Sequence, residues 1–197
     1  DIYHEASIAQ IQTNIGNKTC PVTSAITNST PVVAALTNYT IPISTPFALT
    51  GSATDADAGD VLTYCWEQND NASSSQTGNS SRASATKASG PNWLSFPATT
   101  SPTRYFPQLS TILAGGTTTG PLTGGDAGVL IEALSSVSRT LNFRLTVRDN
   151  APYSSTAPVS VGQTQFTDMV VTVSNTSGPF TVTAPNTAIS YTGGSSQ

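Results

Sequence analysis

Strict two-residue alternation of apolar and polar side chains is the feature that most constrains this chain. Residues 141–149, LNFRLTVRD, place an apolar residue at every second position: Leu141, Phe143, Leu145 and Val147. Successive side chains of a β-strand point to opposite faces, so this segment predicts a strand with one buried face. Residues 166–174, FTDMVVTVS, predict its partner, with Met169, Val171 and Val173 opposed to Val170 and Thr172.

Two earlier segments show the same period. FALTGSA (47–53) has Phe47, Leu49 and Gly51 on one face. VLTYCWE (61–67) has Leu62, Tyr64 and Trp66 on one face and Val61, Thr63, Cys65 and Glu67 on the other. We expect these two to be neighbouring strands joined by the acidic stretch between them. The prediction is an all-β sandwich, two sheets around a tryptophan-centred core.

The rest of the chain divides around these strands. Residues 1–17 have the apolar spacing of a helix with a glycine stop at Gly16, the one convincing helix. A proline-rich connector follows, with one edge strand expected near PVVAAL. Residues 68–138 form a long irregular insertion in which TRYFPQLSTIL is the piece expected to pack, and loops of that length are usually functional or mobile. A new strand-like pattern after Ser174 suggests that the chain is truncated at both ends.

Composition excludes several classes of partner. Charged residues make up 9% of the 197 residues and the net charge is −4, whereas soluble domains typically have about 25% charged residues. Without a basic stripe, nucleic acid and anionic membranes are poor partners. No apolar run is long enough to span a membrane, and no signal peptide opens the chain. The neutral, hydroxyl-rich surface is typical of secreted or cell-surface β-proteins.

The order of motifs resembles a known region. The helix with HEASIAQI is followed by YTIPISTPFALTGSATDADAGDVLTYCWEQND, SPTRYFPQLSTIL, RTLNFRLTVRDN and GPFTVTAPNTAISYTGGSSQ. This series resembles the region after the catalytic domain in secreted bacterial reprolysin-like zinc metallopeptidases, where Ig-like or cadherin-like modules lead to a secretion-sorting tail. The resemblance covers nearly the whole chain.

The resemblance implies a division of the chain. Residues 1–17 look like the helical end of an upstream peptidase-like domain, 18–30 like a linker, 31–175 like an Ig-like or cadherin-like sandwich with a long insertion, and 176–197 like the truncated start of a following β domain. We expect a non-catalytic spacer or adhesion module beside a metallopeptidase domain. Its expected partners are neighbouring domains of the same chain and a cell-surface protein or polysaccharide.

The residues independently argue against catalysis. A zinc peptidase needs His-Glu-x-x-His on a helix to present two imidazoles on one face, and HEASI has Ile8 where the second histidine belongs. Since His4 is the only histidine, neither that zinc site nor a Ser-His-Asp triad is available. We expect no catalytic residues and no zinc in this chain, with the peptidase machinery lying upstream in the parent protein.

The acidic stretch TDADAGD allows a calcium hypothesis. Calcium takes six to eight oxygen ligands, often from aspartates close in sequence. In a sandwich of this type, the loop after the penultimate strand lies at the same end as this stretch. We therefore predict a calcium site from Asp55, Asp57, Asp60, Asp149 and Asn150. The alternative is a hairpin turn without a ligand, since Asp and Gly favour turns and Arg148 could neutralise the charge.

Alternation also predicts a disulfide. If Trp66 faces the core, Cys65 lies on the outer face of its sheet, where a free thiol is disfavoured in a secreted protein. Cys20 in the connector is the one other cysteine. We predict a Cys20–Cys65 bridge, worth about 4 kcal/mol through its effect on the unfolded chain. Two free, packed thiols are the alternative.

A carbohydrate- or protein-binding module with its own ligand is the alternative function. Exposed aromatic rings stack on sugars, and Trp93, Tyr105 and Tyr153 lie in segments outside the predicted strands. Scattered aromatics of this kind more often cover the edge of a core.

Overall fold

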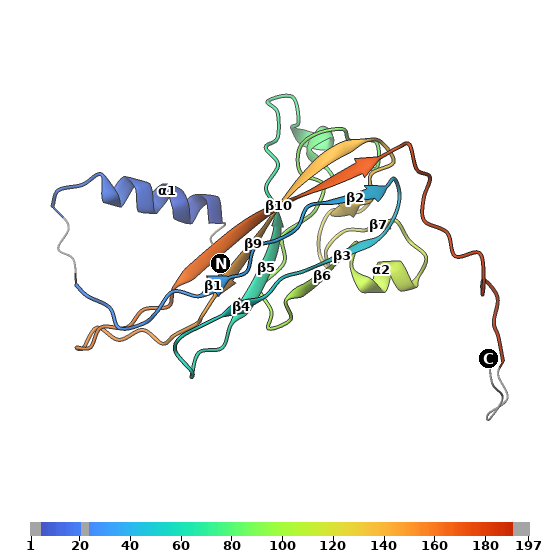
Figure 1. Cartoon of the computed structure of the whole chain (residues 1–197). Coiled ribbons are helices and arrows are strands. Elements are labelled where there is room, and N and C mark those ends of the chain that lie inside the picture. Colours follow the sequence, from blue (N-terminus) through green and yellow to red (C-terminus); the bar gives the residue numbers. More distant parts are fainter. Residues whose placement is uncertain (1–4, 21–23, 191–197) are drawn as a thin grey trace.

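The protein is mainly β, with few helices. A computed structural model describes residues 5–20 and 24–190. The elements in chain order are α1 (Glu5–Gly16), β1 (Val32–Val33), β2 (Tyr39–Pro42), β3 (Phe47–Thr50), β4 (Ala53–Thr54), β5 (Thr63–Gln68), the 3-10 turn η1 (Gly78–Ser81), β6 (Thr103–Phe106), α2 (Leu109–Leu113), β7 (Thr118–Thr119), β8 (Glu132–Ala133), β9 (Arg139–Arg148) and β10 (Thr164–Ser174) (Figure 1).

The largest sheet has the order β2-β10-β9-β5. β9 pairs antiparallel with β10 on one side and with β5 on the other, and β2 runs parallel to β10. Two-stranded sheets complete the fold: β3 with β6, β1 with β4, and β7 with β8. The predicted partnership between the two long strands is confirmed. The connector contains a second strand that the sequence analysis missed, β2, which ends at Pro42.

The core lies where the large sheet faces β3 and β6. Leu141, Phe143, Leu145 and Val147 of β9 are all at most 1% exposed, as the alternation predicts. Trp66 of β5 joins the same cluster, as do Met169, Val171 and Val173 of β10, the face that alternation separated from Val170 and Thr172. From the other side, Leu49 and Phe106 complete it, and Phe106 stacks on Phe47 with ring centroids 4.9 Å apart.

The acidic stretch connects different sheets. β4 pairs with β1, whereas β5 pairs with β9, so the two strands on either side of it are not hydrogen-bonded to each other. The expectation of a hairpin is therefore wrong. The chain crosses instead from one sheet to another, and Asp55, Asp57 and Asp60 are half-buried at this end of the molecule.

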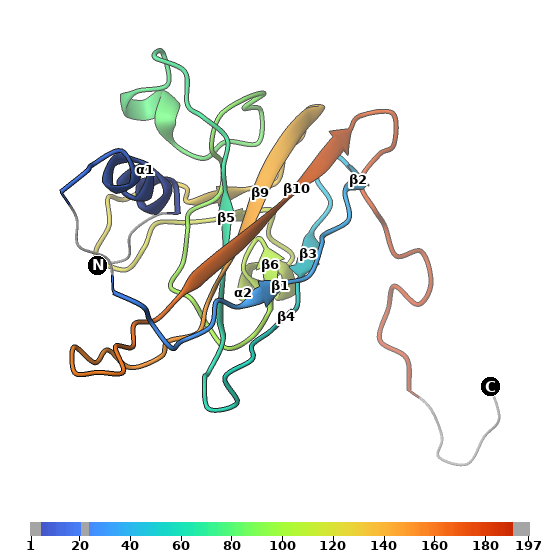
Figure 2. The same cartoon turned by 60° about the vertical axis from the view of Figure 1, so that its left-hand side comes forward.

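Three connections meet at that end. The β4–β5 connection, the loop after β9 and the connector before β1 lie together at the lower end of both views (Figures 1 and 2). Ile26 forms a parallel bridge with Val159, and the Thr27 N–H donates to the Val159 carbonyl at 3.2 Å. The connector is therefore hydrogen-bonded to the loop between β9 and β10 before it enters β1.

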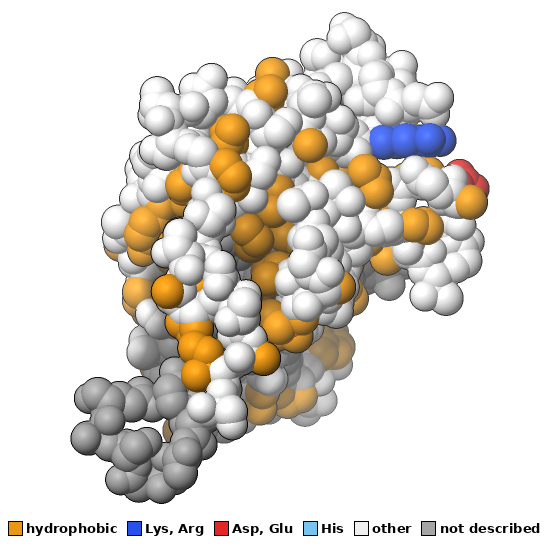
Figure 3. Space-filling model, turned by 90° about the vertical axis from the view of Figure 1, so that its right-hand side faces the viewer, with side chains coloured by type: hydrophobic (Ala, Val, Ile, Leu, Met, Phe, Trp, Pro, Cys, Tyr) orange, Lys and Arg blue, Asp and Glu red, His pale blue; other side chains and the backbone are white. Residues whose placement is uncertain are grey.

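The two ends of the described chain extend from this body. α1 is exposed, with Ile11 and Ile15 47% and 55% accessible. Residues 175–190 contain no helix or strand and run away from the sheets in both views. Figure 3 shows a face on which apolar side chains fill the hollows between uncharged ridges and charged side chains are sparse.

Candidate functional site: an acidic end joined to the linker

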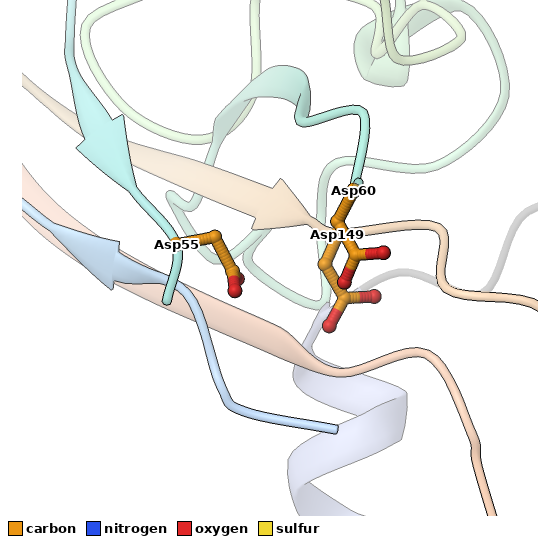
Figure 4. Close-up of side chains that lie close together, drawn as sticks. All are labelled: Asp55, Asp60 and Asp149. Atoms are coloured by element: carbon orange, nitrogen blue, oxygen red, sulfur yellow. The ribbon is translucent and has the colours of Figure 1, made fainter. Parts of the chain in front are cut away.

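Three carboxylates converge at the end where these connections meet. Asp55 follows β4, Asp60 lies just before β5, and Asp149 directly follows β9. One carboxylate oxygen from each lies within 4.8 Å of the others, and the side chains are drawn together in Figure 4. We call Asp55, Asp57, Asp60 and Asp149 the acidic end.

Asp149 is the fixed member of the group. Its side chain is completely buried. Oδ1 accepts the N–H groups of Ala151 at 3.0 Å and Gln163 at 2.9 Å, and Oδ2 accepts the amide of Asn28 at 2.6 Å. These bonds hold the loop after β9 closed and fix the direction of the carboxylate, because two donors come from the two ends of that loop and the third from the linker.

Asp55 and Asp60 each have a carboxylate oxygen without a donor. Oδ2 of both residues is shielded from solvent and forms no hydrogen bond within the described part of the protein. Burial, together with the negative charges of Asp149, Asp55 and Asp57, raises the pKa of Asp60 above the ordinary value of 3.8. The end therefore carries negative charge that its own protein groups do not fully compensate.

The other two predicted ligands point elsewhere. Asp57 accepts the Ser29 N–H through Oδ2 at 2.7 Å, so its carboxylate binds the linker. The Asn150 amide donates to the Val61 carbonyl at 2.7 Å and to Thr63 Oγ1 at 3.0 Å. Of the five residues predicted for calcium, the structure brings three together and uses Asp57 and Asn150 as braces between segments.

The sequence analysis missed the contribution of the linker. Asn28 donates to Asp149 Oδ2 and to the Val161 carbonyl, and Ser29 donates to Asp57. Both belong to a segment that we had expected to be only an extended connector. No local pattern marks these two residues, since asparagine and serine are abundant along the whole chain.

Such an arrangement suits a hard divalent cation. Three carboxylates close together supply charged oxygen donors, and Ca²⁺ takes its ligands from carboxylates and carbonyls at 2.3–2.6 Å. The two oxygens without donors are the groups that a cation would satisfy. The described residues offer no imidazole as a metal ligand, because His4 lies outside them.

The structure does not contain the predicted Cys20–Cys65 disulfide. Both cysteines are free, Cys20 exposed and Cys65 buried. Cys65 does point away from Trp66, but residues 96–99 cover it: its Sγ contacts the Phe96 carbonyl oxygen at 3.3 Å, and Tyr64 pairs with Thr99. Burial raises the pKa of the Cys65 thiol to about 11. Part of the insertion therefore occupies the outer face that the prediction left open to Cys20.

The predicted aromatic candidates for sugar binding do not gather. Trp93 is only 5% exposed and packs edge-on against Phe106, with ring centroids 5.3 Å apart. Tyr105 on β6 is 41% exposed, and Tyr153 in the loop after β9 is 75% exposed. Because Trp93 belongs to the core, it cannot serve as a stacking platform.

A buried ion pair holds the insertion beside this core. Glu132 is completely buried and accepts hydrogen bonds from Arg104 at 2.9 Å, from the Gln108 N–H at 2.9 Å and from Thr119 at 2.8 Å. Arg104 also donates to the Trp66 carbonyl at 2.7 Å. These bonds fix β6, β7 and β8 against β5, so much of the segment predicted to be irregular is ordered.

Comparisons with protein families, curated proteins and solved structures found no match for this chain. Within the described ranges, no helix is long and apolar enough to cross a membrane.

Proposed function

We propose that this chain is a non-catalytic accessory module, a spacer or adhesion domain of a secreted or cell-surface multidomain protein resembling a metallopeptidase. In this proposal the acidic end binds calcium, and the ion stiffens the junction with the preceding segment. Neighbouring domains of the same chain are the first partners.

The strand order supports an Ig-like or cadherin-like sandwich over residues 31–175. β5, β9 and β10 are consecutive antiparallel neighbours, and β2 adds to β10 in parallel. β3 and β6 face this sheet across the core. Ig-like domains combine a sheet containing their third, sixth and seventh strands with a second sheet containing the second and fifth. The same relationship holds here between β5, β9, β10 and the β3–β6 pair.

The observation that carries the proposal is the attachment of the linker to the acidic end. Asn28 and Ser29 are bonded to carboxylates that come from two different connections. A module that acts as a spacer must transmit orientation to its neighbour, and a linker held by several bonds does this better than a free chain. A calcium ion bound by Asp55, Asp60 and Asp149 would offset the repulsion between their negative charges.

The non-catalytic part of the proposal rests on the lack of a histidine base in the described ranges and on the state of the buried cysteine. Their residues include no histidine. The buried Cys65 thiol has its pKa raised, which is the opposite of what a nucleophilic cysteine requires. Casein hydrolysis by this chain alone would overturn this part of the proposal.

Calorimetry and thermal melting test the calcium site. We expect one calcium ion to bind each chain, with stabilisation of about 2.7 kcal/mol at one hundred times the dissociation constant. Asp55→Asn and Asp60→Asn should each weaken binding, because each removes a charged ligand. Asp126→Asn, which neutralises an exposed carboxylate in the β7–β8 connection, is the matched control and should bind as the parent does.

Hydrogen exchange tests the link to the spacer role. Calcium should slow exchange of the Ser29 amide, which donates to Asp57. Calcium binding without any protection of residues 26–29 would reject a junction role and leave a metal site only. The absence of binding heat and of any melting shift at millimolar calcium would reject the site itself.

A further inference from the structure

A hollow in the insertion, away from the acidic end, is built more rigidly than a connecting loop requires. Its walls come from residues 81–83, 91–94 and 129–131, which are far apart in sequence, and it encloses about 270 Å³. Long irregular insertions are usually functional or mobile. Ordering such an insertion costs conformational entropy for every residue. Side-chain hydrogen bonds that hold the insertion in one conformation therefore need an explanation.

Asn92 and Lys87 supply the braces. The Asn92 side chain is 1% exposed, donates to the carbonyls of Ser84 at 3.0 Å and Ala133 at 2.8 Å, and accepts the Ser84 N–H at 2.8 Å. The Lys87 ammonium donates to the carbonyls of Ser81 at 2.9 Å and Pro91 at 2.8 Å. The walls formed by residues 81–83 and 91–94 are therefore held in place in the absence of a ligand, as in most small-molecule sites.

The wall formed by residues 129–131 is hydrogen-bonded through its backbone to the wall formed by residues 91–94, and its side chains are apolar. Leu94 donates its N–H to the Ile131 carbonyl at 3.0 Å. Val129, Leu130 and Ile131 are half-buried along the hollow, and Leu94 is 37% exposed. Trp93 also lines the hollow. These side chains leave an apolar surface facing solvent that an apolar group of similar size would cover.

The region around the hollow is positive although the chain is acidic. Of the seven lysines and arginines in the chain, Arg82, Lys87 and Arg139 gather here, and only Arg139 among these three has a carboxylate partner in the described residues, Asp70 at 3.8 Å. Arg82 lines the hollow, and its guanidinium has no carboxylate partner among the described residues. Arg139 donates to the Lys87 carbonyl at 2.9 Å, and burial together with the charge of Arg139 lowers the pKa of Lys87. This potential favours an anionic group at the mouth.

We propose that this hollow binds the C-terminal residue of a peptide chain, with an apolar side chain against Leu94 and Leu130 and the terminal carboxylate at Arg82. Arginine suits this role because its planar fork matches a carboxylate in two places. A free amino acid fits less well, since its ammonium group would lie close to the same positive cluster. The site is independent of the calcium proposal, and neither depends on the other.

The two tryptophans give the test an internal reference. Trp93 lines the hollow, whereas Trp66 lies elsewhere and donates its indole N–H to the Pro102 carbonyl at 3.0 Å. In protein labelled with ¹⁵N-tryptophan, N-acetyl-leucine and N-acetyl-phenylalanine should shift the Trp93 indole signal saturably and leave the Trp66 signal in place. N-acetyl-leucinamide, which has no carboxylate, should bind about tenfold more weakly, a difference of about 1.4 kcal/mol.

Variants and peptides separate this proposal from its alternatives. Arg82→Gln should weaken N-acetyl-leucine by about tenfold, and Lys18→Gln, which removes an exposed charge outside the insertion, should not. N-acetyl-Ala-Ala-Leu should bind, whereas N-acetyl-Leu-Ala-Ala should not. Three results would overturn the proposal: no saturable Trp93 shift at millimolar probe, equal binding of acid and amide, or equal binding of the two peptides.

Discussion

Replacing Gly51 with alanine should create a specific clash in the core. Gly51 lies between β3 and β4, and its N–H donates to the Pro102 carbonyl at 3.2 Å. A Cβ added there would stand 2.1 Å from Leu145 Cδ2 and 3.6 Å from Trp66 Cζ2. The first distance is far below van der Waals contact, so Leu145 or the backbone of residue 51 must move.

Leu145 has little room to move. It is completely buried and lies in β9, which is paired on both edges. Overfilling a packed core usually lowers the free energy of unfolding by about 1–3 kcal/mol. Because this contact is so short, we expect Gly51→Ala to cost about 3 kcal/mol. Leu145→Ala alone should cost about 2–5 kcal/mol through lost burial and the cavity left behind.

The double variant gives the sharper measurement. In Gly51→Ala with Leu145→Ala, the new methyl group would occupy part of the vacated space and meet no clash. The cost should therefore fall about 2 kcal/mol below the sum of the two single costs, a coupling typical of residues in contact. Urea unfolding followed by tryptophan fluorescence, with chelator present, measures each free energy of unfolding.

Gly120→Ala is the matched control, because a Cβ there meets nothing within 4 Å. It should change stability by less than about 1 kcal/mol. If the two core substitutions proved additive, or if Gly51→Ala cost no more than Gly120→Ala, the packing argument for Gly51 would be refuted.

Three further predictions concern a buried ion pair, a clustered carboxylate and a buried thiol. Glu132→Ala should cost about 3–5 kcal/mol in urea unfolding because it leaves its arginine partner buried and uncompensated. Asp168→Ala breaks a pair whose carboxylate is 53% exposed and should cost less than about 1 kcal/mol. Asp60 has its pKa raised on folding, so its contribution to stability is fully present below pH 3.8 and is lost as the pH rises through the folded pKa. In chelator, Asp60→Asn should therefore raise the urea midpoint at neutral pH, and the gain should vanish in acid; an unchanged midpoint would contradict the shift. Iodoacetamide should alkylate Cys20 rapidly and Cys65 only on unfolding, and two fast thiols in the folded protein would contradict the burial of Cys65.

Part of the acidic end could be predicted from the sequence. Asp149 follows a strand of clear alternation, and Asp55 lies in the stretch between two alternating segments, so their shared end of the fold was accessible to sequence reasoning. The hydrogen-bond partner of each side chain at this end could not be predicted from the sequence. Asp57 accepts from Ser29 of the linker, and Asn150 donates to Val61 of the β4–β5 connection; both contacts depend on the paths of irregular segments that have no pattern of their own.

The sequence by itself determined the long strands and the inward face of β9. Alternation is local, and β9 buries the predicted residues because a strand has only two faces, one of which must exclude water. For β10 alternation separated the two faces, and the tertiary structure decided which one is buried. The fate of the outer faces and connections was decided only by the tertiary structure. Cys65 is covered by residues 96–99, and Trp93 joins the core. These outcomes depend on where distant segments come to rest, and in irregular segments no repeating pattern records that position.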